Sequence, residues 1–229
     1  MSITHHQYCA EDFAQVSDFL IAHYLPDNKD GNWLQPAWEY MHTHPYLDVD
    51  SLDKIRIWEN SKEIVAVVNY EHRLGEAFSR VHPDYDDLKS DMLEYAESAL
   101  RGKTKDGEFY LHVYVNDFDT AFGSLVRSKG YRHNHKKDRP FTKLKIPRPF
   151  PKISLIDGFV LKSLADDNDL YKINRLLWRG FNHPGEPPEE DIEGRKKMQS
   201  DPNFRKELTI VVEAPSGDFV SFAGTWFVP

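Results

Sequence analysis

Two histidine pairs are the side chains of this 229-residue chain that most resemble a set of metal ligands. His42 and His44 form one pair, and His133 and His135 form the other. Each pair could place two imidazoles near one another, and imidazole nitrogen is a preferred ligand of zinc and related metals. Neither pair comes with cysteines or carboxylates at metal-ligand spacing, so the sequence alone predicts no metal site.

Nucleophilic and nucleotide chemistry find little support in the sequence. Cys9 is the one cysteine, and a lone thiol is more often a small buried hydrophobic group than a nucleophile. The chain has no Walker loop, no Gly-x-Ser-x-Gly elbow and no Cys-x-x-Cys pair. Because these motifs are absent, the sequence gives no indication of the chemistries that they define.

The first part of the chain alternates between helix and strand patterns. Apolar residues at spacings of three and four predict a helix over residues 10–25, and a proline near a first turn suits a short helix over 35–41. Residues rich in β-branched side chains predict a hairpin of strands over 54–60 and 63–73, followed by a strand over 76–81.

The pattern continues to a proline-rich stretch at residues 147–151. A helix is predicted over 90–102, a strand over 108–115, a helix over 119–133 and a strand over 141–146. The predicted order is β-α-α-β-β-β-α-β-α-β, which includes an N-terminal strand ahead of the first helix.

The same pattern begins again at Gly158, which predicts a repeated architecture. Residues 159–164 read as a strand, 169–181 and 191–200 as helices, and 208–227 as a strand hairpin. We therefore expect one domain over residues 1–148, a proline-rich linker over 149–157 and a partial second domain over 158–229. Chance resemblance between two ordinary α/β stretches is the alternative.

The element order resembles that of the GCN5-related N-acetyltransferase (GNAT) superfamily. The supporting motifs are Val-His-Pro-Asp-Tyr at residues 81–85, just before a helix, and Lys-Gly-Tyr at 129–131, where a later helix ends. The resemblance covers residues 1–148 and restarts over 158–229. It implies an α/β fold, a mixed and mostly antiparallel sheet flanked by helices, with one complete copy and the first part of a second. It also implies that acetyl-CoA or another acyl-CoA donates an acyl group to an amine.

The cofactor motif of this family is absent from the first domain. In GNAT proteins the pyrophosphate binds backbone amides where the helix after strand four begins, at Gln or Arg, two residues, Gly, one residue, then Gly or Ala. Asp86, Lys89 and Asp91 stand at the three defined positions here. The resemblance places cofactor contacts at Val81, Lys89 and Ser90, but acids at the helix start repel a bound pyrophosphate.

Catalytic residues are equally weakly indicated. Many GNAT enzymes carry a tyrosine as general acid one turn before the Gly-aromatic pair, and Val126 stands there and cannot donate a proton. Glu71 and Glu76 lie where related enzymes position a base that deprotonates the amine. The alternative explanation is that both glutamates are ordinary polar residues on an exposed hairpin.

In this family, loops between the first two helices shape the acceptor pocket. The first copy offers Asn32 and Trp33, and the second offers Trp178 and His183. Aromatic walls with polar groups are typical of ligand sites, although these aromatic residues also suit a core.

These inferences lead to two functional expectations. One is an acyl-CoA-dependent N-acyltransferase, or a fragment of one, whose first domain is non-catalytic and whose acceptor is a small-molecule amine or a peptide. Because the second copy stops early, the chain is then expected to be a piece of a longer tandem protein. The other is a non-enzymatic, degenerate GNAT domain that binds a small molecule or a protein. An open sheet edge also offers a surface for homo-oligomer formation.

Composition narrows the class of partner and the location. A net charge of -8 argues against a nucleic-acid-coating protein, although residues 127–148 are locally basic. The 40% of hydrophobic residues can form a folded core. No stretch is apolar enough to cross a bilayer and the N-terminus lacks a signal-peptide pattern, so we expect no membrane partner and a cytoplasmic location.

Overall fold

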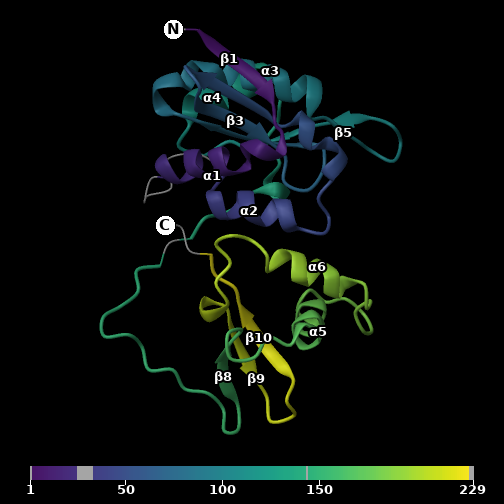
Figure 1. The fold of residues 1–229 in the computed structure, drawn as a ribbon. Coiled ribbons are helices and arrows are strands. Elements are labelled where there is room, and N and C mark those ends of the chain that lie inside the picture. Colours follow the sequence, from purple (N-terminus) through teal and green to yellow (C-terminus); the bar gives the residue numbers. More distant parts are fainter. Residues whose placement is uncertain (1, 25–32, 143, 227–229) are drawn as a thin grey trace. The chain divides into compact units, whose positions relative to one another are not determined.

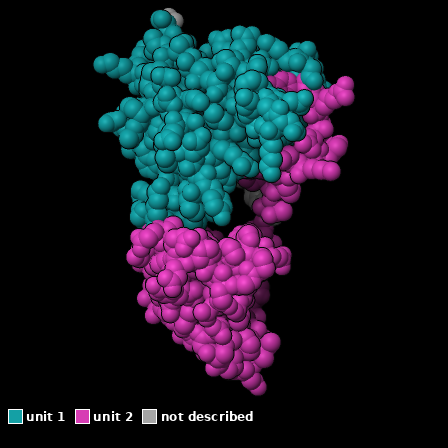
Figure 2. Space-filling view, turned by 90° about the vertical axis from the view of Figure 1, so that its right-hand side faces the viewer, with its two compact units in different colours: residues 1–130, 197–203, 227–229 teal, residues 131–196, 204–226 magenta. Residues whose placement is uncertain are grey.

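The computed structural model describes residues 2–24, 33–142 and 144–226 (Figure 1). The chain divides into two compact units, coloured separately in Figure 2. The first contains Met1–Gly130, Lys197–Asn203 and Phe227–Pro229, and the second contains Tyr131–Lys196 and Phe204–Trp226. Residues 131–148, assigned from the sequence to the first domain, therefore group with the second unit.

A five-stranded sheet forms the centre of the first unit. Its order is β1 (Ile3–Gln7), β2 (Arg56–Asn60), β3 (Glu63–Asn69), β4 (Glu76–Val81) and β7 (His112–Val113). Neighbouring strands from β1 to β4 are antiparallel, whereas β7 runs parallel to β4. The sheet is mixed and mostly antiparallel, which confirms the predicted fold class.

Helices cover both faces of this sheet, with α1 and α2 on one side and α3 and α4 on the other (Figure 1). Their bounds are α1 Phe13–Ala22, α2 Gln35–Thr43, α3 Lys89–Ala99 and α4 Thr120–Ser128. Short 3-10 helices lie at η1 Ala10–Asp12, η2 Val49–Lys54 and η3 Pro83–Leu88. Each predicted helix of this half is therefore present, with shifted ends.

The core of the first unit collects the apolar stripe of each helix against the sheet. Trp38 of α2 is fully buried, and its indole Nε1 donates a hydrogen bond to the Phe13 carbonyl at 3.2 Å. The Tyr8 ring meets the Trp38 ring edge-on at a centroid distance of 5.4 Å. These contacts fix α2 against α1 and β1, as the spacing of their apolar residues predicts.

The second unit contains a smaller sheet with two helices. Its elements are β8 (Val160–Ser163), α5 (Leu170–Gly180), α6 (Asp191–Met198), β9 (Ile210–Glu213) and β10 (Phe219–Ala223). The sheet order is β10-β9-β8 with antiparallel neighbours, and short 3-10 helices lie at η4 His135–Lys137 and η5 Lys206–Leu208. Strand, helix, helix, strand, strand is also the order from β1 to β3. That order agrees with the predicted repeat, while a tandem origin stays a prediction.

Two strand predictions were wrong in detail. Residues 108–115 do not form one strand: β6 (Phe109–Tyr110) pairs with β5 (Gly102–Lys103), and β7 follows separately. Among the described residues of 141–146, none is in a strand, and Phe141, Leu144 and Ile146 are exposed. Alternating side chains predict a strand only where a partner strand supplies the backbone hydrogen bonds, and Pro140 and Pro147 bracket this segment.

In the part of the chain that is described, no helix has both the length and the apolar character that crossing a membrane requires.

Candidate functional site

The chain enters α3 through a tight 3-10 turn instead of a glycine-rich loop. Beyond β4, His82 caps η3, and its Nδ1 accepts the backbone N–H of Asp84 at 3.1 Å. The N–H of Tyr85 donates to the His82 carbonyl at 2.9 Å, and the N–H of Lys89 donates to the Asp86 carbonyl. These amides therefore serve the turn itself and do not form a cradle for phosphate.

The ammonium of Lys89 is held between two carboxylates at the start of α3. Its Nζ lies 2.7 Å from Asp86 Oδ1 and 2.5 Å from Asp119 Oδ2. Asp119 is also the N-cap of α4, since its Oδ1 accepts the backbone N–H of Phe122 at 3.0 Å. The ion pair thus ties the starts of α3 and α4 together at the predicted cofactor position.

We call this cluster of Asp86, Lys89 and Asp119 the Lys89 clamp. The positive charge of its lysine is already neutralised by the two carboxylates. Burial opposes the charge on Lys89, but hydrogen bonds to Asp119 and Asp86 outweigh it, and the pKa of the ammonium is raised. The Lys89 and Asp119 side chains are each 17% exposed. A pyrophosphate would have to displace two carboxylates from the lysine and then lie beside them, so these residues do not fit an acyl-CoA.

Aromatic rings pack just beyond the paired residues of the two parallel strands. β4 and β7 pair at Glu76 with His112 and at Ala77 with Val113, and the next residue on each strand is aromatic. Phe78 and Tyr114 stack with ring centroids 4.2 Å apart and planes 6° apart.

Trp33 adds a third ring to this group. The centroids of the Trp33 and Phe78 rings are 4.4 Å apart, and both side chains are buried. Trp33, expected from the family resemblance to line the acceptor pocket, is therefore part of this aromatic packing. Asn32, the other predicted acceptor residue of the first copy, lies outside the described residues.

The remaining predicted cofactor residues do not gather around a free site. Val81 ends β4 with its side chain buried and is paired in register with Ala66 of β3. Ser90 follows Lys89 in the first turn of α3 and is half-buried. Their role in cofactor binding stays a prediction.

The two predicted catalytic glutamates each lie near a histidine, and their role as a base stays a prediction. Glu71 lies 3.9 Å from Nδ1 of the neighbouring His72, and Glu76 begins β4 opposite His112. Val126 is buried in α4, and its alkyl side chain cannot supply the proton that a departing thiolate needs. The first unit therefore shows no proton donor at the position where the family resemblance predicts one.

In the second unit, the two predicted acceptor residues contact each other. The rings of Trp178 and His183 stack with centroids 4.4 Å apart, and the Trp178 indole donates to the Pro184 carbonyl at 3.1 Å. His183 is exposed. The pair stabilises the turn after α5 and offers one exposed aromatic face.

Sequence reasoning did not identify the one pocket described in the first unit. It has a volume of about 500 Å³, within the range of small-molecule sites, and lies between α1, β3 and η3. Its lining residues are Gln15, Asp18, Phe19, Ala22, His23, Glu63, Ile64, Val65, His82, Asp84 and Tyr85.

Two imidazole rings lie among the residues that line this pocket, and a buried guanidinium contacts one of these residues. His23 and His82 meet edge-on with centroids 4.5 Å apart. Burial, with further contributions from His82 and Arg80, lowers the pKa of His23 and favours its neutral form. The buried Arg80 guanidinium donates to the His23 carbonyl, so its charge is directed at the end of α1.

The first histidine pair is separated by its surroundings. The His42 ring packs among Tyr8, Phe13 and Trp38, whereas the His44 ring packs beside His72 with centroids 4.3 Å apart. The two imidazoles thus have different neighbours and do not form a common ligand set.

Cys9 differs from its predicted environment. Its thiol is exposed, because the residue caps the short 3-10 helix before α1 and does not face the core. Hydrogen bonds with the Glu11 and Asp12 carboxylates raise the pKa of the thiol. A raised pKa disfavours the thiolate, so Cys9 remains unsuited to act as a nucleophile.

Comparison with known proteins finds solved structures with a similar fold and no match to a protein-family model or a curated protein sequence. A solved GCN5-related N-acetyltransferase from Sphaerobacter thermophilus is 13% identical, with 98% of this chain and 72% of that chain covered and a TM-score of 0.48. A transcriptional regulator from Bacillus halodurans C-125 is also 13% identical, with 62% of this chain and 100% of that chain covered and a TM-score of 0.36. Neither likeness is close enough to assign an activity, and what the chain can bind depends on the residues described above.

Proposed function

We propose that this chain is part of an N-acyltransferase-like protein and that its first unit is a non-catalytic domain without an acyl-CoA site. The element order supports the acyltransferase-like part of this proposal. The Lys89 clamp is the observation that supports the non-catalytic part. It places Asp86 and Asp119 where a pyrophosphate would need backbone amides and a positive field.

Local chemistry points in the same direction. The Phe78 and Tyr114 rings stack just beyond the paired residues of β4 and β7, and Val126 stands where the resemblance predicts the tyrosine acid. A transfer step needs a base, a polarising N–H and a proton donor, and valine cannot serve as the donor.

Calorimetry with acetyl-CoA tests this proposal. Because two carboxylates oppose the pyrophosphate, we expect the 229-residue chain to bind with a Kd weaker than about 1 mM. CoA serves as an additional probe, since it keeps the pyrophosphate and lacks the thioester. Saturable micromolar binding of either compound would overturn the non-catalytic assignment.

A second candidate function is binding of a small amine in the pocket between α1, β3 and η3. Asp18, Glu63 and Asp84 contribute carboxylates, and Phe19 and Tyr85 contribute apolar ring surface. This combination suits a cationic head group with a short apolar chain. The candidate corresponds to a binding module without enzymatic activity.

Amide NMR with 1,4-diaminobutane as the probe tests the second candidate. We expect shifts confined to residues that line the pocket, and a loss of about two- to fivefold in affinity when Asp18 and Glu63 are both replaced by their amides. Asp50→Asn, at an exposed position of η2, is the matched control. Shifts spread over the acidic surface, equal in all variants, would argue against a pocket ligand.

A further inference from the structure

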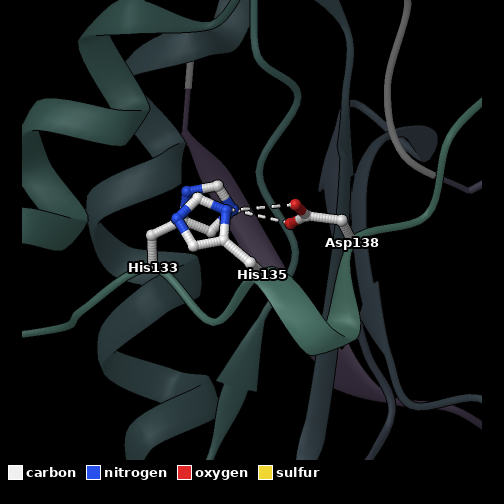
Figure 3. A group of neighbouring side chains, drawn as sticks. All are labelled: His133, His135 and Asp138. Atoms are coloured by element: carbon white, nitrogen blue, oxygen red, sulfur yellow. Dashed lines mark hydrogen bonds and ion pairs between the residues drawn. The ribbon is translucent and has the colours of Figure 1, made fainter.

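A turn in the second unit brings two imidazoles and a carboxylate together. One ligand atom each from His133, His135 and Asp138 lies within 4.8 Å of the other two (Figure 3). The sequence predicted no metal site because no carboxylate stood at a recognisable ligand spacing from the second histidine pair. The fold of the turn supplies that carboxylate.

The local backbone explains why these three side chains converge. Asn134 caps the single turn η4, and its side-chain oxygen accepts the Lys136 N–H at 3.3 Å. The Lys137 N–H donates to the Asn134 carbonyl at 2.9 Å, which closes the turn. The chain reverses here, so Asp138 returns to the side on which His133 lies.

One of the two distances to Asp138 is close to that between ligands of a metal site, and the other is that of a direct hydrogen bond. His133 Nε2 is 2.6 Å from Asp138 Oδ1, and His135 Nδ1 is 3.5 Å from Asp138 Oδ2. The two imidazole rings have centroids 4.0 Å apart. In a tetrahedral zinc site with metal–ligand bonds of about 2.0–2.2 Å, neighbouring ligand atoms are about 3.3–3.6 Å apart.

We propose that His133, His135 and Asp138 form a zinc-binding site with a fourth position open to water. Two imidazoles and one carboxylate are ligands of the type zinc prefers, and three protein ligands leave one position of the tetrahedron for solvent. Small side-chain rotations would separate His133 from Asp138 and admit the ion. Zinc binding would hold this turn in its closed form. The turn lies within residues 131–159, and the described part of that segment has no strand.

The surroundings set the strength of this site. His133, His135 and Asp138 are all exposed, and the neighbouring Lys136 and Lys137 add positive charge that opposes a cation. The site is therefore expected to be weaker than a closed structural zinc site. It does not depend on the proposed function of the first unit.

Calorimetric titration of the full chain with zinc chloride tests the proposal, in a non-chelating buffer and without a histidine tag. We expect one saturable equivalent of zinc. His133→Ala, His135→Ala and Asp138→Asn are each expected to raise the Kd by about tenfold or more. His183→Ala, which removes an exposed histidine of the same unit, is expected to leave the Kd unchanged.

Histidine ring-nitrogen NMR gives a readout that does not depend on variants. Zinc is expected to shift the ring nitrogens of His133 and His135 and to leave those of His183 unchanged, while magnesium produces no shift. Absence of saturable zinc binding would overturn the proposal. Binding that is equal in the three ligand variants and the wild type would also overturn it.

Discussion

Replacing Trp38 with alanine is expected to lower the free energy of unfolding of the first unit by about 3 to 5 kcal/mol. Trp38 is fully buried, and its ring contacts those of Tyr8, Phe13 and His42. Removal leaves a large cavity and also removes the indole hydrogen bond to the Phe13 carbonyl at 3.2 Å. Urea unfolding followed by far-ultraviolet circular dichroism measures the change.

A matched aromatic control separates burial from side-chain type. Tyr46 follows α2 and is 76% exposed, so Tyr46→Ala is expected to change stability by less than about 0.5 kcal/mol. If Trp38→Ala destabilised the unit no more than Tyr46→Ala does, the described packing of α2 would be wrong.

The second large effect is a loss of stability on acidification that originates at His42. Burial lowers the pKa of this imidazole to about 4, with Lys197 adding to the effect and the hydrogen bond to the Trp38 carbonyl opposing it. An unfolded histidine has a pKa near 6.5. Below that pH, His42 binds a proton in the unfolded chain but stays neutral in the folded chain until the pH approaches about 4. His42 therefore contributes stability that is present above pH 6.5 and is lost as the pH falls to about 4. The expected loss is about 2 to 3 kcal/mol.

Comparing wild type with His42→Gln isolates this contribution. The raised pKa of Asp201, about 7 because of burial, acts in the opposite direction, since protonation of that carboxyl favours the folded state as the pH falls. Both proteins contain Asp201, so the difference between their stability curves over pH 4 to 6.5 reports on His42. Parallel curves would show that the imidazole is not buried in neutral form. His5→Gln, at an exposed position in β1, is the control.

Local patterns were enough to predict most elements of the fold. The stripe that includes Val16, Phe19 and Leu20 marks α1 because a helix must bury one face, and these residues are buried. The strand predicted over 141–146 was wrong because alternation describes side chains, whereas a strand also needs a partner for its backbone. That partner is a property of the tertiary structure and cannot be inferred from the segment itself.

Some residues of the candidate site could likewise be predicted from the sequence, and others could not. Asp86, Lys89 and Asp91 could be compared with a motif because the motif is local, and the misfit was predicted from the sequence. Asp119 could not be identified, since it lies 30 residues from Lys89 and only the packing of α3 against α4 brings the two together. Asp138 was overlooked because a turn, and not a regular spacing, brings it to His133.

We infer that the Lys89 clamp prevents an acyl-CoA from binding at the start of α3. Installing the family motif through Asp86→Gln, Lys89→Gly and Asp91→Gly removes the clamp and one net negative charge. The triple variant loses about 1 kcal/mol per added glycine in the helix, so circular dichroism must first show that it is folded. Asp87→Asn, an exposed acid of the same turn, is the matched control.

The decisive measurement is the ratio of acetyl-CoA affinities of the triple variant and the wild type, determined by calorimetry under one set of conditions. We expect no saturable binding to the wild type or to Asp87→Asn up to about 1 mM, and an affinity at least about tenfold higher for the triple variant. Micromolar binding to the wild type, with an affinity equal to that of the triple variant, would contradict the inferred effect of the clamp.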